Sequence, residues 1–493
     1  MYNNLEDFKG KHISGSLKEK TEYFKDIFKN DAVFRYRTLS CHGFDCTLMF
    51  MDGMINADTL SESIVRPLLL ASPEKGEKID DFVQKKVVFV GELKRTTEVL
   101  EILRGLLYGD TVILLEEGDA MVINTKGWRT RGISEPNDER ILQGPREGFD
   151  EAAMLNIAML RRKLPTPDLQ VEMQHLGKRT DTKVFICYLA SLIKKDVLKE
   201  LKKRLSKINI DGVLDSNYIN ELIKDNRYSI LKTVGTTERP DIVAARLLEG
   251  RVAVIVDGTP VVLTLPYLFC ENFQSDDDYY LNFWVASVGR MLRYICFFLA
   301  TSVPAIYLSL VNFFPSLLPT TFVISISAAR SGIPFPAFVE CIILIFVFEV
   351  LKETGVRMPQ SLGHALSIVG GLVVGQAAVE AKIVSAPMLI VVALSGICGL
   401  MIPRLKGVVF YARIIFTLMS SLFGLLGFFT GISALLVLTL KMDSFGADYS
   451  ESVKRFNMSS LKDVYWRVPW WQMRTRPRTL SDNQIRNRSG EKE

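Results

Sequence analysis

The chain has 493 residues, with 60 lysines and arginines against 55 aspartates and glutamates, and its net charge of +5 does not argue for a nucleic-acid partner. Its seven cysteines, an odd number scattered along the chain, argue against a disulfide framework and fit a reducing compartment. The mean hydropathy of +0.18 averages a charged half, up to about residue 280, and an apolar half over residues 295–440. This division predicts a large soluble head followed by a membrane domain.

The head begins with a polar, lysine-rich leader over residues 1–30, which has no apolar core and so does not read as a secretory signal. We therefore expect the head to stay in the cytoplasm. A first α/β subdomain is predicted over residues 31–140. Within it, residues 92–109 have helical periodicity up to Gly109, and residues 110–128 read as two strands around the turn Glu-Glu-Gly-Asp.

A second α/β subdomain is predicted over residues 141–284. Helical patterns occur at residues 147–164 and 194–208, the latter strongly basic, and residues 183–192 resemble a short buried strand. Two further β-rich runs flank Asp257 and Gly258, which is a strong hairpin signal. We find no long internal sequence repeat.

The head lacks recognisable catalytic and metal-binding motifs. Neither Gly10-Lys11 nor Gly177-Lys178 lies in a phosphate loop, and no histidine opens an H-E-x-x-H motif. Cys41, His42 and Cys46 resemble half of a metal site, but no second ligand pair has suitable spacing. We expect no enzymatic activity, no cofactor and no metal.

The membrane domain is predicted over residues 285–442, with four to six membrane segments. Three apolar runs without charged residues are each about 20 residues or more, the length that crosses a bilayer: 295–314, 383–403 and 414–440. A fourth run, 335–351, contains Glu340 and Glu349. A carboxylate inside the membrane is a candidate functional group. The alternative for Glu340 is a helix start marked by the nearby prolines, where the exposed N–H groups stabilise a carboxylate.

The segment Gly363–Lys382 is uncharged up to Glu380 and rich in glycine. At 100° per residue, one helix face is an apolar stripe that ends in an amide and a carboxylate: Leu366, Val369, Val373, Gln376 and Glu380. The opposite face carries the small residues Gly371, Gly375 and Ala378, a pattern that permits close helix packing. We interpret the first face as a pore lining, with valines as a hydrophobic gate and Glu380 favouring cations. The alternative is a glycine-rich helix buried between its neighbours.

The charges give conflicting indications of topology. Basic clusters near Lys352 and Arg404 favour the cytoplasmic side, which leads to five crossings and a C-terminus outside. The tail, residues 443–493, is itself basic, however, and favours the inside. Its tryptophans, Trp466, Trp470 and Trp471, suggest an anchor at the membrane surface. An even number of crossings follows if the glycine-rich segment is re-entrant, or if residues 319–335 enter the membrane partway.

Three long blocks of the chain resemble a known family. Residues 133–169, residues 249–280 and residues 352–397 are similar to signatures of the A subunits of GerA-type spore germination receptors. The resemblance implies a subunit of a nutrient-gated assembly in the inner membrane of bacterial spores. It implies B and C subunits as partners, with the nutrient site in the B subunit, and a homo-oligomer, expected to be a pentamer, that conducts ions.

From the resemblance and the residues together, we expect a channel in the lipid bilayer that releases monovalent cations. A non-conducting scaffold that assembles the B and C partners is the alternative. A second alternative, within the family, is a paralogous A-like protein that amplifies germination. A transporter or a membrane enzyme is disfavoured, because we detect neither an inverted repeat nor a nucleophile with its base.

Overall fold

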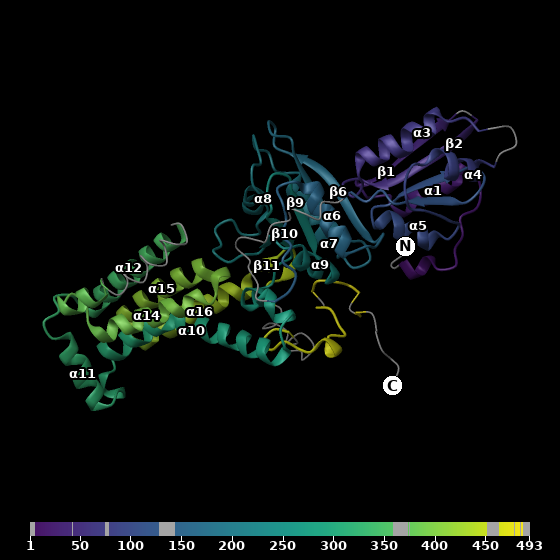
Figure 1. The fold of residues 1–493 in the computed structure, drawn as a ribbon. Coiled ribbons are helices and arrows are strands. Elements are labelled where there is room, and N and C mark those ends of the chain that lie inside the picture. The colour runs from purple at the N-terminus through teal and green to yellow at the C-terminus, as the bar shows by residue number, and fades with distance from the viewer. Residues whose placement is uncertain are drawn as a thin grey trace.

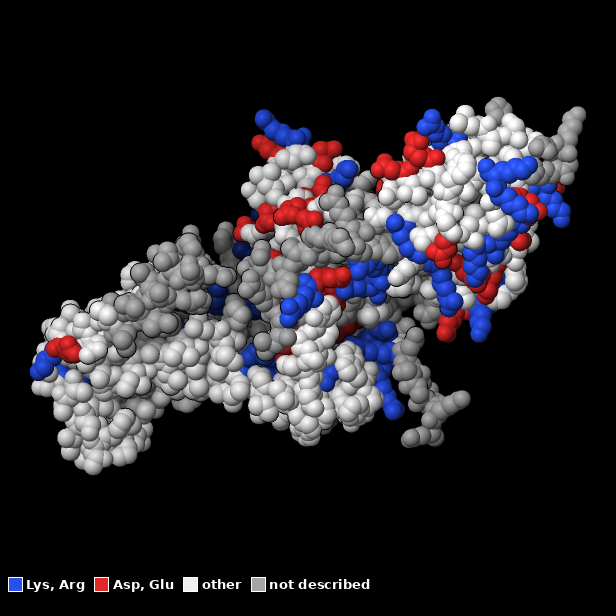
Figure 2. All heavy atoms as spheres, viewed as in Figure 1, with Lys and Arg blue, Asp and Glu red and all other residues white. Residues whose placement is uncertain are grey.

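The computed structural model describes residues 5–41, 43–73, 78–127, 143–357, 373, 375–450, 463–477, 479–483 and 485–486. Two α/β units come first along the chain, and an elongated bundle of helices follows them (Figure 1). The expected fold class, two α/β subdomains ahead of a helical domain, is confirmed. Charged side chains gather on the head, whereas the bundle shows few apart from a small group at its far end (Figure 2).

The first unit is an antiparallel sheet of five strands in the order β1-β2-β4-β5-β3. Its strands are β1 (Phe34–Cys41), β2 (Phe44–Met51), β3 (Leu93–Thr96), β4 (Thr111–Leu115) and β5 (Ala120–Ile123). Helices α1 (Leu17–Ile27) and α5 (Val99–Leu107) bury their apolar residues against one face. The other face is covered by short helices: α2 (Ala57–Leu60), η2 (Ser61–Val65), α3 (Arg66–Leu70), α4 (Ile79–Phe82) and η3 (Val83–Val87).

The polar leader contributes to this first unit. Ser16 and Glu19 form a capping box at the start of α1, which satisfies two N–H groups that the first turn leaves without partners. Phe24 on the same helix is fully buried in the core. The leader is therefore polar on one side and apolar on the other.

The second unit repeats the arrangement of the first, with strand order β6-β7-β9-β10-β8. Its strands are β6 (Leu169–Leu176), β7 (Thr182–Leu189), β8 (Gly235–Thr237), β9 (Val252–Val256) and β10 (Val262–Leu265). Helices α6 (Ala153–Lys163) and α9 (Pro240–Leu248) cover one face, and α7 (Lys195–Leu205) and α8 (Ser216–Ile223) the other. Counted from the start of each unit, the strand orders are identical although no sequence repeat is evident.

The two units share one apolar core. A single buried cluster runs from Phe24 and Met49 of the first unit to Ile157 and Phe185 of the second. Inside it, the Arg161 guanidinium pairs with the Asp31 carboxylate, and both side chains are fully buried. Because a buried charge is stable only with a partner, this pair fixes the two units against each other.

The bundle contains helices α10 (Phe283–Asn312), α11 (Thr320–Arg330), α12 (Ala337–Arg357), α14 (Ala386–Leu400), α15 (Lys406–Phe423) and α16 (Leu425–Lys441). In the described part of the chain, two stretches are long and apolar enough to cross a membrane, Phe283–Asn312 and Pro403–Phe423. Helices α14 and α16 are apolar but shorter. Helix α10 starts beside the head and runs to the far end, where α11 lies (Figure 1).

The apolar run at residues 414–440, which we expected as one segment, folds as two helices. The chain reverses at Gly424, whose φ of +58° is a left-handed conformation that favours glycine. Helices α15 and α16 then pack tightly, with the rings of Phe416 and Phe428 6.1 Å apart. After α16 the chain returns to the head through a small hairpin of β11 (Asp443–Ser444) and β12 (Ala447–Asp448), where Ser444 donates to the Thr233 carbonyl.

We predict that Gly427→Ala destabilises this helical hairpin. A Cβ at Gly427 would lie 2.0 Å from the main-chain oxygen of Met419, so the helices would have to separate. Overpacking of this kind lowers the free energy of unfolding by about 1–3 kcal/mol. Gly407→Ala is the matched control, because a Cβ there meets only Ile230, at 3.8 Å. Thermal unfolding in detergent measures both; equal unfolding temperatures for the two variants would contradict the packing.

Candidate functional site

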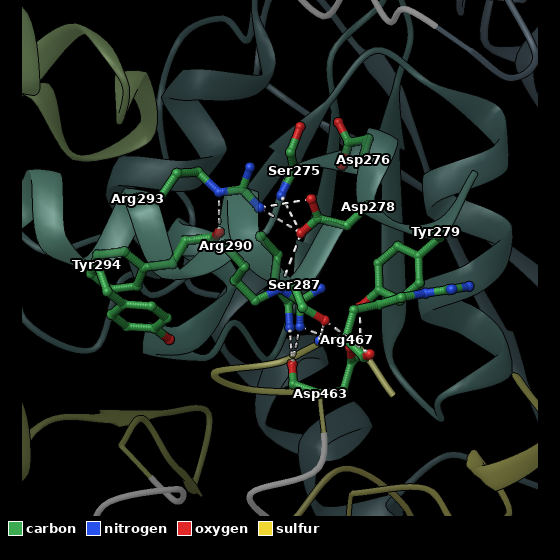
Figure 3. A network of polar contacts seen from close by, with 12 residues as sticks. Ser275, Asp276, Asp278, Tyr279, Ser287, Arg290, Arg293, Tyr294, Asp463 and Arg467 are labelled. Carbon is green, nitrogen blue, oxygen red and sulfur yellow. Dashed lines mark hydrogen bonds and ion pairs between the residues drawn. The ribbon is translucent and has the colours of Figure 1, made fainter. Parts of the chain in front are cut away.

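A buried ion-pair network joins the head to the bundle. The linker between β10 and α10, residues 266–282, contains a 3-10 turn, η5 (Asp276–Tyr279), whose Asp278 is buried. Arg290 of α10 donates from Nε to this carboxylate at 3.0 Å, and Arg293 donates from Nη2 to both carboxylate oxygens, at 2.7 and 2.6 Å (Figure 3). The two arginines are three residues apart, so they lie on the same helix face. The linker is thereby held against the first turns of α10.

The C-terminal tail enters the same network. Arg290, fully buried, also donates from Nη1 to Asp463, at 2.8 Å to the carboxylate and 2.5 Å to the main-chain oxygen. Tyr279 donates its hydroxyl to the other carboxylate oxygen of Asp463 at 2.6 Å. Burial raises the pKa of Asp463, and the charge of Arg290 opposes that rise. One guanidinium therefore connects linker, helix and tail.

The linker also reaches the start of α15 and the second sheet. Arg404, just before α15, donates to both oxygens of Asp276 at 3.0 and 3.1 Å and to the carbonyl of Gln274. Further back, Arg251 beside β9 donates to the buried Glu271 at 2.5 Å. Separate ion pairs thus tie the linker to the second sheet and to the bundle.

A proline and an arginine form a second polar site, inside the bundle. Pro304 in α10 has no N–H, so the carbonyl of Ala300, four residues earlier, lacks its helical partner. Two neighbouring helices replace that partner: Ser395 Oγ of α14 donates to it at 2.7 Å, and Arg413 Nε of α15 at 2.9 Å. Arg413 also donates from Nη2 to the Ser395 carbonyl at 3.0 Å. The carbonyl that lacks its helical partner in α10 therefore connects three helices, α10, α14 and α15.

Glu340 is fully buried in the first turn of α12, and its carboxylate faces the start of α14. The main-chain N–H of Ser385 donates to Oε1 at 2.6 Å, and the Ser385 hydroxyl donates to the same atom at 2.5 Å. Arg330 of α11 lies 3.9 Å from Oε2. Because Ser385 is the N-cap of α14, the Glu340 carboxylate binds the start of a neighbouring helix while it lies in the first turn of its own helix, α12.

The glycine-rich segment is described at residue 373 and from residue 375 onward; Leu366, Val369 and Gly371 lie outside the described residues. Val373 is 56% exposed, and Gln376 and Glu380 are exposed as well, with the Gln376 amide donating to the Glu380 carboxylate at 2.9 Å. On the other side, Gly375 and Ala378 face the bundle. A Cβ at Gly375 would lie 3.5 Å from Leu389 of α14, and Ala378 packs on the cluster around Met388.

Cys41 and Cys46 do not assemble a metal site in the part of the chain that is described, where no group of three or more metal-ligating side chains occurs. His42, the third residue of that motif, lies outside the described residues. Burial raises the pKa of Cys46, which disfavours the thiolate that a metal would need. All seven cysteines are free thiols.

The sequence model of the family described as "Bacillus/Clostridium GerA spore germination protein" matches residues 18–479. The chain belongs to the GerA family. It is 36% identical over 482 residues to "Uncharacterized membrane protein YfkQ" of Bacillus subtilis (strain 168), covering 97% of this chain and 94% of that protein. It is 38% identical over 437 residues to "Spore germination protein KA" of the same strain, covering 88% and 80%.

Among solved structures, the N-terminal domain of the A subunit of the Bacillus megaterium spore germinant receptor GerK3 is 26% identical, covering 52% of this chain and 98% of that one, with a TM-score of 0.42. Membership of the GerA family confirms the resemblance seen in the three sequence blocks. A membrane location fits both the printed name of YfkQ and the two long apolar helical stretches of this GerA-family chain.

Several residues that organise this GerA-family chain were missed or misread from sequence. Two arginines at the start of an apolar run are typical of membrane-interface anchors, yet Arg290 is fully buried and both Arg290 and Arg293 bind Asp278. Arg413 was not singled out, although a proline inside an apolar run signals a carbonyl in need of a donor. The pairing of Asp463 has no local signal, since its partner is 173 residues away.

We predict that Asp278→Asn destabilises the junction by roughly 3 kcal/mol, because removing one member of a buried ion pair leaves the other charge uncompensated. Unfolding of the detergent-solubilised chain, followed by tryptophan fluorescence, measures the loss. Glu22→Gln is the control, since the Glu22–Lys25 pair is exposed and such pairs contribute little. An equal loss in both variants would show that the Asp278 network does not hold the junction.

We predict that Pro304→Ala and Arg413→Met are not additive. Alanine at 304 supplies the missing N–H to the Ala300 carbonyl, so the loss of the Arg413 donor then matters less. The coupling energy expected for groups in direct contact is about 0.5–3 kcal/mol. Urea unfolding in mixed micelles measures it. The additive control pairs Pro304→Ala with Ser325→Ala, a change on an exposed residue of α11. Additive effects in both double-mutant cycles would contradict the proposed coupling between Pro304 and Arg413.

Proposed function

We propose that this chain is the A subunit of a nutrient germinant receptor in the spore inner membrane, and that copies of it oligomerise into a gated channel for monovalent cations. B and C subunits are the proposed partners, and the head lies on the cytoplasmic side, facing the spore core. The observation that carries the proposal is the two-sided helical segment that ends at Glu380. Its small residues pack inward, and its valine, amide and carboxylate are exposed.

An exposed amide and carboxylate need water or polar partners when the surrounding surface is apolar, because lipid offers them no hydrogen bonds. The bundle around this segment is apolar, and α14 carries no charged residue. A ring of copies would surround the exposed face with identical faces and enclose a polar path. Val373 then narrows the path as a hydrophobic constriction, and Glu380 at its far mouth favours cations.

An even number of crossings supports the proposed orientation. α10 leaves the head, α12 and α14 both run toward it, and the hairpin at Gly424 adds a further pair, α15 and α16 (Figure 1). The chain on either side of the undescribed part of the glycine-rich segment lies at opposite ends of the bundle. Helix α12 ends toward the head, whereas Gly375 lies beside Leu389, near the start of α14 at the end of the bundle away from the head. In the proposed topology the segment between these two ends crosses the membrane, which gives six crossings and puts the basic tail with the head on the cytoplasmic side.

The test is ion flux from liposomes that hold the purified chain alone. Val373→Ala widens the proposed constriction, so potassium leakage without nutrient should rise several-fold over wild type. Val350→Ala is the matched control, because Val350 is a similarly exposed valine on α12 outside the proposed path, and it should leave the flux unchanged. Equal flux from all three chains would count against the gate. No flux from any, with an oligomer confirmed by light scattering, would favour the non-conducting scaffold.

A further inference from the structure

A cavity of about 460 Å³ lies at the junction. Its walls come from four segments: helix α9, the linker with Tyr279, the arginine before α15, and the C-terminal tail with Trp470 and Arg476. Nothing in the network of Arg290 needs this space, since those side chains bond to one another beside it. A cavity enclosed by four separate chain segments is a candidate binding site.

The cavity wall carries more positive than negative charge available to a ligand. Five guanidiniums line it: Arg246, Arg251, Arg404, Arg476 and Arg486. Five carboxylates line it too, but Asp241 and Asp463 are engaged by Arg239 and Arg290 from outside the wall. Among the described wall residues, Glu249, Glu271 and Asp276 are left to balance the five arginines, which leaves two positive charges in excess.

The excess positive charge lies on the arginines of the tail and on Arg251. Arg476 donates only to main-chain carbonyls, at Leu248, Asn483 and Ile485, and has no carboxylate partner among the described residues. Arg486 shares Glu249 with Arg251. The Nε of Arg251 is buried and has no hydrogen-bond partner in the described structure. Burial lowers the pKa of Arg476, the charge of Arg486 adds to that effect, and the Glu249 carboxylate only partly opposes it.

Aromatic side chains place this cavity at the level of a membrane surface. Trp284 at the start of α10 is 70% exposed, and Trp466, Trp470 and Trp471 are exposed beside it. The Trp471 ring contacts Phe283 at 5.9 Å, and the Trp470 ring contacts Tyr279 at 6.1 Å. Exposed tryptophans at the end of a long apolar helix mark the interface between lipid and water. The arginines therefore lie at the depth of lipid phosphates.

We propose that this arginine pocket, the cavity lined by the five arginines, binds a phosphate group, supplied by the headgroup of an anionic phospholipid of the surrounding leaflet. Guanidinium forks match the several oxygens of a phosphate better than any single-point cation does. The cavity is larger than a phosphate alone, and Tyr279 and Trp470 offer room and contact for the glycerol that follows it. Binding would clamp the tail, the linker and α9 together.

The test uses the full chain in a neutral detergent, with short-chain phosphatidylglycerol as the probe and native mass spectrometry and thermal unfolding as readouts. Wild type should retain the lipid and unfold at a higher temperature. The matching diacylglycerol, which lacks the phosphate, should do neither. Inorganic phosphate that binds as tightly as the lipid at the same concentration would overturn the lipid source and assign the pocket to a soluble anion.

The variant Arg476→Gln together with Arg486→Gln should weaken lipid retention by about tenfold or more, the factor expected for lost charge-assisted hydrogen bonds. Arg474→Gln is the control, because Arg474 is an exposed tail arginine outside the cavity wall. If the double variant does not fold, Arg476→Gln alone carries the test, since all hydrogen bonds of Arg476 to described residues go to main-chain oxygens. Retention unchanged in a folded variant, or lowered equally by Arg474→Gln, would overturn the proposal.

Discussion

The buried guanidinium of Arg290 is the interaction on which the connection between head and bundle depends. It is desolvated completely, so it needs both Asp278 and Asp463 to compensate its charge. These carboxylates come from chain segments on either side of the whole helical region, one preceding α10 and one following α16. The bundle can be correctly joined to the head only after the tail has returned, which couples the assembly of the two halves.

The same logic operates inside the bundle, where the groups that need a partner belong to the backbone. The carbonyl that Pro304 leaves open attracts Ser395 and Arg413, and the start of α14 is held by Glu340. In each case a backbone group that lacks a partner within its own helix finds a side chain on another helix. Where lipid gives no hydrophobic drive for helix association, such polar contacts and close packing decide which helices become neighbours.

Local pattern predicted the elements whose signals are strong, including the hairpin at Asp257-Gly258 and α5, which ends before Gly109. The predicted start of that helix at residue 92 was wrong, because Leu93–Thr96 form strand β3. Local pattern did not predict β1. Its residues, FRYRTLSC, are largely exposed and include two arginines, so the strand shows no clear alternation of apolar and polar residues. The repeated strand order left no trace in the sequence, because different apolar residues fill equivalent positions. The reversal at Gly424 was missed, since a single glycine between apolar runs looks the same in a continuous helix. The exposed face with Val373 and Glu380 follows from helical spacing, whereas the arginine pocket depends on contacts between distant segments that no local pattern contains.

More than one segment of the chain attaches the head to the bundle. The linker enters α10, the hairpin after α16 docks on the Thr233 loop, and the tail returns to Leu192, where Ser481 donates to its carbonyl. A body attached at one point can rotate about it, whereas three separate attachments oppose such rotation. A tilt of the helices therefore moves the head as one body, and the first α/β unit, which lies farthest from the bundle, moves the most.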